Sequence, residues 1–278
     1  MQTLIKDYAP PPALNGFVRK YQLIRWSFAT HEAPPPKLLQ PRPEHSIAFY
    51  IRDKQSFWHL NSDQSIIYPK VILSGVHTQT IYRDCGHDFL ALKVVLQPCA
   101  LYRLTGIPAP ELTSSFIDAE AIWGKSIRSV FEQIANTDNI AEVLVIVEQF
   151  MHTLIRQSCR PQHPIDQASR LMLTSHPSSS LDWLARQSGI SVRQFIRKFE
   201  ERTGVSPKLF DRIARFDRVY RLKNSYPTLD WLSIALAGGY YDYQHLAKDY
   251  RDFTGTTPVN FYELDQQAPE RQFGLFFG

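Results

Sequence analysis

The sequence predicts an α+β chain of two domains, a β-rich N-terminal barrel or sandwich with helices after it and then an all-α C-terminal domain. First, residues 1–110 alternate β-branched and aromatic residues with polar ones, between turn-forming prolines and glycines. Second, from about residue 113 the apolar residues recur at helical spacing instead. Third, 278 residues are too many for one small core and fall in the range of one to two domains.

Composition narrows the class of protein. The chain is 44% hydrophobic and 21% charged, which is ordinary for a globular protein and excludes wholesale disorder. Its 31 Lys and Arg against 27 Asp and Glu give a net charge of +4, which neither demands nor excludes a nucleic-acid partner. The three cysteines are widely spaced and include no Cys-x-x-Cys pair, so we expect neither a disulfide scaffold nor a cysteine-rich zinc site.

The sequence carries no recognisable targeting signal. Residues 1–12 lack a cationic segment followed by an apolar run, so we expect no signal peptide. The most apolar stretch, 143–155, is interrupted by Glu148 and is too short to span a bilayer. We therefore expect a cytoplasmic protein with reduced cysteines and no membrane partner.

Five N-terminal segments have the residue pattern of short strands. Their spacing, with turn-forming residues between them, is typical of an antiparallel sandwich or barrel. The predicted strands cover residues 17–28, 46–52, 71–74, 78–82 and 89–96.

Two helices are predicted between the strands and the C-terminal domain. Apolar residues at helical spacing indicate one helix over 127–134 and a longer one over 139–158, which starts at Asn139. The apolar stripe of the longer helix either forms a dimer seam or covers the barrel. Two prolines within residues 160–164 cannot continue a helix, so we place the domain boundary there.

The last hundred residues contain a degenerate internal repeat. Each copy has an apolar helix, a glycine turn, a second helix, a glycine stop and a Ser/Thr-Pro pair that opens a third helix. The copies lie 50 residues apart up to Tyr240, and 51 apart after an inserted Tyr241. The matched pairs are Leu184 with Ile234, Gly189 with Gly239, Phe195 with Leu246, Phe199 with Tyr250, Gly204 with Gly255 and Pro207 with Pro258.

Each step of this repeat has a physical reason. A glycine permits the sharp turn between two helices, and Ser191 and Asp242 are suitable caps for the helix that follows. Side chains at i and i+4, such as Phe195 and Phe199, pin that helix to the first one. Any helical hairpin can supply one copy, but two copies with matching caps and stops predict a pair of DNA-binding helix-turn-helix units.

The repeat resembles the DNA-binding domain of the AraC/XylS family of transcription regulators. The first helix-turn-helix of that family is similar to GISVRQFIRKF at 189–199 followed by TGVSPKLF at 203–210. Its second is similar to GYYDYQHLAKDY at 239–250 followed by FTGTTPVNFY at 253–262.

The N-terminal part more loosely resembles the cupin-like sensor domain of the same family, in residues 72–78 and 92–98. The resemblance implies a cupin-like sensor or dimerisation domain over 1–160, a double helix-turn-helix domain over 164–263 and a tail over 264–278.

Three residues of the first reading helix are candidates for base contacts. With Phe195 facing the core, the opposite face carries Arg193, Ile196 and Arg197. Each arginine can pair bidentately with guanine O6 and N7, worth about 1–3 kcal/mol of base discrimination, and Ile196 can touch a thymine methyl. The resemblance implies the same contacts, since the family's reading positions fall on these residues. The alternative is that the arginines lie on a solvated face.

The equivalent outward residues of the second reading helix are Tyr243, Gln244 and Lys248. Gln244 suits the N6 and N7 atoms of adenine, and Lys248 can reach guanine or phosphate. Tyr243 can touch a base edge or a phosphate.

A cation-rich helix is predicted between the two units, from Pro207 to about Lys223. Its length of roughly 26 Å at 1.5 Å per residue is less than the roughly 34 Å between successive major grooves. We therefore predict that the DNA bends or that only one reading helix seats fully. Some cations should pair with Asp211 and Asp217. The candidate phosphate contacts are Lys198, Lys208, Arg212 and Arg215.

The mild total charge hides an uneven distribution. Residues 186–223 hold 11 Lys and Arg against 4 Asp and Glu, a net of +7, whereas residues 224–263 hold 2 against 5, a net of −3. Because phosphate neutralisation supplies most non-specific affinity for DNA, the first unit should dominate binding.

The N-terminal domain has candidate features for a sensor and few for an enzyme. Metal chemistry in a cupin needs a His-x-His motif, which the sequence lacks, so we expect no metal, no cofactor and no catalytic residue. A barrel or sandwich of this size can enclose one small molecule. The candidate lining residues, which are equally suited to a plain core, are His45, Tyr50, Phe57, Trp58 and Tyr82.

The sequence therefore predicts a sequence-specific DNA-binding transcription regulator, an activator and not an enzyme, modulated by a small molecule in the N-terminal domain. Expected partners are double-stranded DNA, a small-molecule effector, a second copy of the chain and RNA polymerase. The alternatives are a cupin-type metal enzyme with an accessory DNA-binding domain, or a module that binds nucleic acid or protein.

Overall fold

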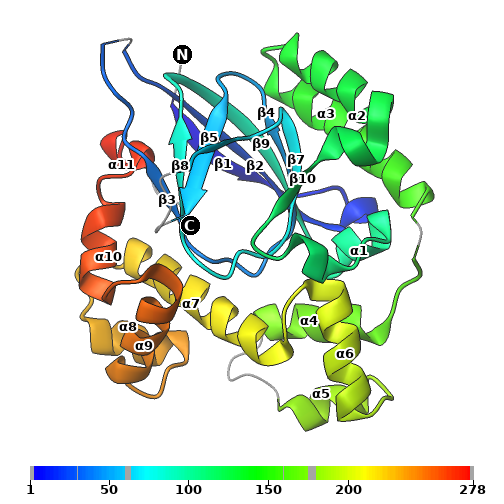
Figure 1. The fold of residues 1–278 in the computed structure, drawn as a ribbon, viewed down its shortest axis with the longest axis vertical. Helices are drawn as coiled ribbons and strands as arrows, with labels where there is room; N and C mark the ends of the chain where they lie inside the picture. The colour runs from blue at the N-terminus through cyan, green and yellow to red at the C-terminus, as the bar shows by residue number, and fades with distance from the viewer. Residues whose placement is uncertain (1–2, 30, 60–63, 159, 175–179, 276–278) are drawn as a thin grey trace.

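The computed structural model describes residues 3–29, 31–59, 64–158, 160–174 and 180–275. Strands occupy the N-terminal part of the chain and helices the C-terminal part, which Figure 1 shows as blue and cyan arrows above mostly yellow and orange coils. The predicted α+β fold class is confirmed.

Two antiparallel sheets form the N-terminal domain. The strands of the larger sheet, in spatial order, are β1 (Leu4–Tyr8), β2 (Val18–Ser27), β9 (Asp88–Leu96), β4 (Ser46–Tyr50), β7 (Val71–Ser74) and β10 (Phe116–Asp118). Those of the smaller sheet are β3 (Lys37–Leu39), β8 (Ile81–Cys85), β5 (Gln55–His59) and β6 (Ile66–Ile67).

All five segments predicted as strands contain strands, but the one predicted over 78–82 begins at Ile81. The reason is a contact between domains, since the Thr80 amide donates to the Phe253 carbonyl at 2.8 Å instead of joining the sheet. The strands β1, β3, β5, β6 and β10 were not predicted. Three of them have only two or three residues, too few for an alternating pattern to be visible.

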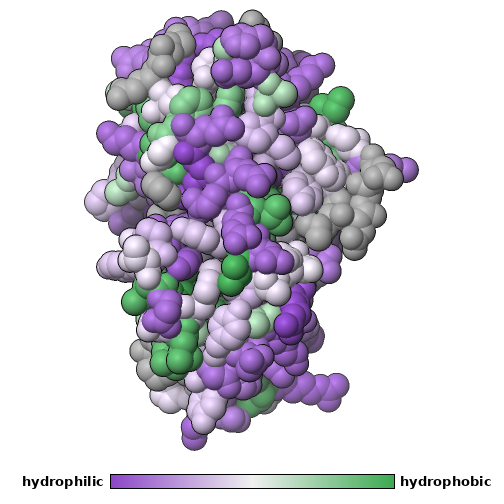
Figure 2. All heavy atoms as spheres, turned by 90° about the vertical axis from the view of Figure 1, so that its left-hand side faces the viewer, coloured by the Kyte–Doolittle hydropathy of each residue, from purple (hydrophilic) through white to green (hydrophobic). Residues whose placement is uncertain are grey.

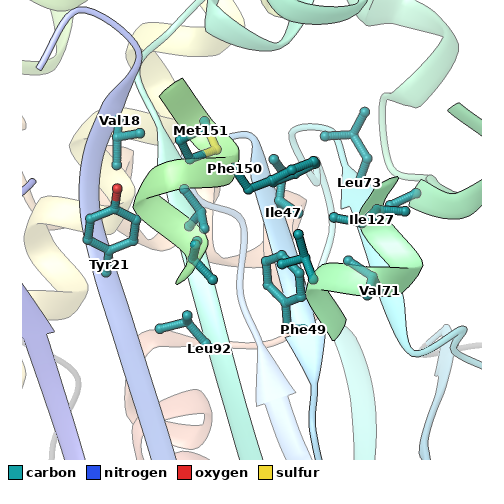
Figure 3. Close-up of a cluster of buried hydrophobic side chains, with 14 of the residues drawn as sticks. Val18, Tyr21, Ile47, Phe49, Val71, Leu73, Leu92, Ile127, Phe150 and Met151 are labelled. Atoms are coloured by element: carbon teal, nitrogen blue, oxygen red, sulfur yellow. The ribbon is translucent and has the colours of Figure 1, made fainter. Parts of the chain in front are cut away.

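The larger sheet is buried on both faces. Successive residues alternate between two cores, so that Leu23 and Phe49 face one side while Ile24 and Tyr50 face the other. Figure 3 shows the first core, in which helical side chains lie over the sheet. Burial on both faces explains why β9 reads as an almost continuous apolar run.

Three helices follow β9: α1 (Ala100–Thr105), which precedes β10, and then α2 (Ala119–Ala135) and α3 (Ile140–Arg156). The predicted helix start at Asn139 is confirmed, because the Asn139 side chain accepts from the Ala141 amide at 3.0 Å. The helix predicted over 127–134 is longer than expected and has a kink at Gly124, where φ is +53°. Short 3-10 turns lie at Pro12–Leu14 and Ala109–Leu112.

The apolar stripe of α3 covers the larger sheet. Val143, Val147 and Phe150 are buried there, and in Figure 3 Phe150 and Met151 point toward strand residues such as Ile47. Of the two roles that the sequence left open for this stripe, the structure supports the covering role, because the stripe is already buried within the chain.

The C-terminal domain is helical throughout its described residues. Figure 1 shows α7 crossing it, with α5 and α6 at one end and α8 and α9 at the other. Its helices are α4 (Pro164–Thr174), α5 (Leu181–Gln187), α6 (Val192–Thr203), α7 (Pro207–Ser225), α8 (Trp231–Gly238), α9 (Tyr243–Thr254), α10 (Pro258–Asp265) and α11 (Pro269–Gln272).

Buried ion pairs join the C-terminal segment to the N-terminal domain. Lys37 of β3 pairs with Asp265 at 3.2 Å and with Glu270, and all three side chains are fully buried. The Tyr220 hydroxyl donates to Asp265, which also pairs with Arg271. We call Lys37, Tyr220, Asp265, Glu270 and Arg271 the junction network. On the side of α10 and α11 the outer surface mixes hydrophilic and hydrophobic residues (Figure 2).

A second contact lies at the end of α6. The Thr203 carbonyl accepts from His45 Nε2 at 3.1 Å, and the Gly204 carbonyl accepts from Thr113 Oγ1 at 2.7 Å. A Cβ atom at Gly204 would lie 2.7 Å from that Thr113 oxygen, so the close approach of the domains requires glycine there. The N-terminal domain therefore touches both halves of the C-terminal domain.

Within the described residues, no helix has both the length and the apolar character needed to cross a membrane.

Candidate nucleic-acid interface and sensor cavity

The first helix-turn-helix unit consists of α5, a turn and α6. Gly189 adopts a φ of +67° in the turn. Ser191 accepts from the Gln194 amide while the Gln194 side chain accepts from the Ser191 amide, a complete capping box. The predicted turn and cap are confirmed.

The second unit repeats this arrangement in α8 and α9. Gly239 has a φ of +93° in the turn, and Asp242 accepts from the His245 amide at 2.8 Å. The Ser206 and Thr257 hydroxyls cap α7 and α10, each just before a proline at the first helical position. The internal repeat read from the sequence is thus present as two copies of one structure.

The predicted inward residues hold each reading helix against its domain. Phe195 and Phe199 of α6 are fully buried, and so are Leu246 and Tyr250 of α9. Phe199 also meets Phe210 of α7 edge to face, with ring centroids 5.4 Å apart. This packing fixes which face of each helix is left outside.

The outward face of α6 presents two free cations. Arg193 and Arg197 are exposed, and in the part of the chain that the structure describes neither makes a side-chain hydrogen bond or ion pair. Ile196, between them, is half-buried. The arrangement leaves both guanidinium groups available to base edges or phosphates.

The outward face of α9 carries two exposed cations, Lys248 and Arg251, and neither makes a side-chain hydrogen bond or ion pair among the described residues. Gln244 and Lys248 are exposed, whereas Tyr243 is half-buried and packs against the C-terminal core. Tyr243 is the first residue of α9, next to the capping Asp242. Gln244 and Lys248 are therefore the better-placed pair for base contacts on this helix.

Of the four predicted phosphate contacts, Lys208 alone is exposed and unpaired among described residues. Lys198 pairs with Glu201 at 3.1 Å, and Arg215 with Asp211 at 3.3 Å. The predicted pairing of other cations with Asp211 and Asp217 is confirmed, the second by Arg221 at 2.8 Å.

Arg212 joins the two units instead of facing outward alone. Its guanidinium pairs with Asp249 at 2.7 Å and also with Asp252, both on α9. Asp249 is 5% exposed and accepts a hydrogen bond from the Tyr240 hydroxyl as well. Two of the acidic residues that make the second unit net negative are thus structural partners. Sequence reasoning missed this contact because 37 residues separate Arg212 from Asp249.

A cavity of about 100 Å³ lies between the two sheets of the N-terminal domain. Of the five candidate lining residues, only Tyr50 lines it. Trp58 stacks on Tyr82, Phe57 stacks on Tyr68, and His45 bonds the C-terminal domain. The sequence therefore predicted that a small cavity could exist but did not locate its walls.

The wall of this cavity includes several charged side chains. Glu44 pairs with Lys93 and with Arg19, the latter at 2.6 Å. Burial alone would raise the pKa of the Glu44 carboxyl, but Lys93 and Arg19 hold that pKa well below its usual range. The remaining cations of the wall are Lys37, Arg42 and Arg83. The described residues contain no cluster of three or more His, Cys, Asp or Glu that could hold a metal ion.

Comparison with known proteins gives matches for both domains. Residues 184–263 match the sequence model of a helix-turn-helix domain family, and residues 6–118 match that of a domain of unknown function (DUF6597). No curated protein matches the sequence.

Among solved structures, the chain is similar to an apo variant of ToxT from Vibrio cholerae, with a TM-score of 0.49, 9% identity, and coverage of 87% of this chain and 96% of that one. Wild-type ToxT bound to an unsaturated fatty acid gives a TM-score of 0.47 at 11% identity, covering 87% and 94%. The AraC-like transcriptional activator CuxR gives 0.28 at 16% identity, covering 80% and 87%.

The two helix-turn-helix units, with their exposed reading faces, define a DNA-binding transcription regulator. Residues 184–263 belong to that helix-turn-helix domain family, and this domain follows a β-rich N-terminal domain.

Proposed function

We propose that this regulator reads DNA mainly with α6 and uses α9 as a secondary contact. The observation that carries this is the contrast between the two units, since α6 exposes two unpaired arginines in a unit of net charge +7, whereas the exposed cations of α9, Lys248 and Arg251, lie in a unit of net charge −3. Arg193 and Arg197 would contact guanine edges, and Ile196 a thymine methyl. Gln244 and Lys248 would contact bases more weakly, with Tyr243 at the edge of the contact.

Phosphate contacts would position the protein on its operator. Lys208 is the strongest candidate, because it is exposed and has no intramolecular partner among described residues. Lys198 and Arg215 would each contact a phosphate while they remain paired with Glu201 and Asp211. Arg212 would mainly hold α7 against α9.

The proposal is tested by selecting binding sites from random double-stranded DNA with the full chain and then measuring Kd for matched variants. Arg197→Ala should weaken binding about 10-fold or more, and Lys248→Ala about 3-fold or less, because one bidentate guanine contact is worth about 1–3 kcal/mol. Arg156→Ala, an exposed cation at the end of α3, serves as the control. Equal losses for Arg197 and Lys248 would contradict the assignment.

We also propose that a small molecule in the cavity between the sheets modulates DNA binding. The cavity wall supports this, because Lys37 and Arg42 line it and also pair with Asp265 and Asp217 of the C-terminal domain. The same proposal includes a domain division at 160–164 and a cytoplasmic location. It also includes a homodimer and a contact with RNA polymerase.

A further inference from the structure

Arg83 is a buried cation without a counter-charge. Its side chain on β8 lines the cavity and is 6% exposed, and its Nε and Nη2 atoms have no hydrogen-bond partner in the described part of the chain. Its guanidinium lies 5.0 Å from the centroid of the Phe89 ring and bonds the Tyr50 hydroxyl. Among the described residues no carboxylate pairs with it.

The other cations of the cavity wall are paired. Lys93 pairs with Glu44, Arg42 with Asp217 at 3.7 Å, and Lys37 with Asp265 and Glu270. Lys37 and Arg83 are also direct cross-strand partners on β3 and β8, which places two like charges at one rung of the sheet. Asp265 and Glu270 of the junction network neutralise the charge of Lys37, whereas no carboxylate among the described residues neutralises the charge of Arg83.

Gln40 adds unused hydrogen-bonding capacity to the same cavity. It is 4% exposed, and neither its side-chain amide nitrogen nor its side-chain amide oxygen has a hydrogen-bond partner within the described residues. Arginine stays charged at all accessible pH values, so Arg83 cannot escape its burial by losing a proton. A buried charge without a partner is strongly unfavourable, and an anion in the cavity would satisfy the free atoms of both residues.

The rest of the wall sets the size and character of that anion. Ile24, Ala48 and Ile72 supply apolar surface beside the polar groups. A cavity of about 100 Å³ is smaller than the roughly 150 Å³ that accommodates benzene in an engineered core. The space therefore suits a molecule of a few heavy atoms with one charged end and a short hydrocarbon part.

We propose that the cavity binds a small organic carboxylate, with its head group on Arg83 and Gln40 and its hydrocarbon part against the apolar wall. This rests on the proposed sensor role and names the chemistry of the effector. Occupancy would act on the C-terminal domain through Lys37, since an anion at the shared rung competes with Asp265 and Glu270 for positive charge.

The first experiment measures thermal unfolding of the full chain with acetate, propionate, butyrate and hexanoate, each against its neutral amide. We expect a saturable rise in Tm with one or more of the short acids, a smaller effect of hexanoate, and none with the amides. Sodium phosphate and sodium chloride at equal ionic strength test inorganic anions. The proposal is overturned if amides match acids, if no acid acts, or if phosphate or chloride reproduces the full saturable shift.

The second experiment uses variants. Arg83→Met keeps the bulk and removes the charge, so it should raise the Tm of the ligand-free chain and weaken carboxylate binding at least 10-fold. Gln40→Leu gives a second test that does not depend on Arg83→Met folding, and should weaken binding several-fold. Arg52→Gln removes an exposed cation on another surface and should leave binding unchanged.

Unchanged carboxylate binding in both cavity variants would overturn the assignment. Binding to the DNA selected above is measured separately without ligand. If the ligand-free chain does not bind the selected DNA, the proposed DNA reading is contradicted. If it binds DNA but no carboxylate raises its Tm, this inference alone is contradicted.

Discussion

His45 is a buried histidine at the contact between the domains. Its Nε2 donates to the Thr203 carbonyl, while its Nδ1 has no partner. Burial lowers the pKa of His45 from 6.5 to about 4, although Thr203 and Glu44 act in the opposite direction. The folded protein thus holds His45 neutral over a pH range in which the unfolded chain would protonate it.

This depressed pKa predicts a loss of stability in mild acid. The contribution is fully present above pH 6.5 and is lost as the pH falls toward the folded value of about 4. Between pH 7 and pH 5.5 we expect a loss of about 1 kcal/mol from this residue. His45→Gln keeps an N–H donor and cannot titrate, so urea unfolding at the two pH values should show a smaller difference for it. The exposed His152→Gln is the control, and equal pH dependence in both variants would contradict this account.

Arg212 shows why the role of one residue cannot be read from its type. Its position in a cation-rich helix predicts a phosphate contact, but the fold brings Asp249 within 2.7 Å. The sequence places Asp249 and Asp252 in a net-negative unit without indicating that they brace α7.

Among the helices, α6 has the most completely formed N-terminal cap. The capping box of Ser191 and Gln194 satisfies backbone amides that no helical carbonyl reaches. It also fixes where the reading face begins, two residues before Arg193.

Removal of this cap should weaken the first reading helix. Ser191→Ala is expected to cost about 1 kcal/mol of unfolding free energy, and to weaken DNA binding through a less ordered α6. Urea unfolding and Kd for selected DNA check the two effects. Ser126→Ala, at an exposed site in α2, is the matched control and should change neither.

The length of α7 sets the separation of the two units. Its 19 residues span about 28 Å at 1.5 Å per residue, close to the length predicted from the sequence and short of the roughly 34 Å between successive grooves. We expect bent DNA wherever both reading helices are engaged. Circular-permutation gel shifts combined with footprinting measure this, and straight DNA with a two-groove footprint would rule it out.

At the scale of the whole molecule, the junction network holds the C-terminal segment against β3. Lys37, Asp265 and Glu270 are fully buried, so removing one partner leaves an uncompensated charge. The change in unfolding free energy when one partner is removed therefore measures how much this contact between the domains stabilises the chain.

Lys37→Met should therefore destabilise the full chain by about 3–5 kcal/mol. Replacing Glu270 by Met as well should restore part of the loss, because Lys37→Met deprives Glu270 of its ion-pair partner, whereas Asp265 keeps its pair with Arg271. Lys20→Met, which breaks the more exposed pair with Asp7, should cost less than about 1 kcal/mol. Denaturant unfolding measures all three, and a double variant no better than Lys37→Met alone would refute this account of the network.

The sequence by itself determined the two-domain order, the long helix over 139–158 and the double helix-turn-helix with its turns and caps. These features depend on periodicity and on local hydrogen bonds, which involve residues within a few positions of each other. The tertiary structure alone decided the partners of Arg212, the walls of the cavity and the junction network. Those contacts join residues far apart in the chain, such as Lys37 and Glu270, which are separated by 233 positions, and no local pattern records which distant charge will face which.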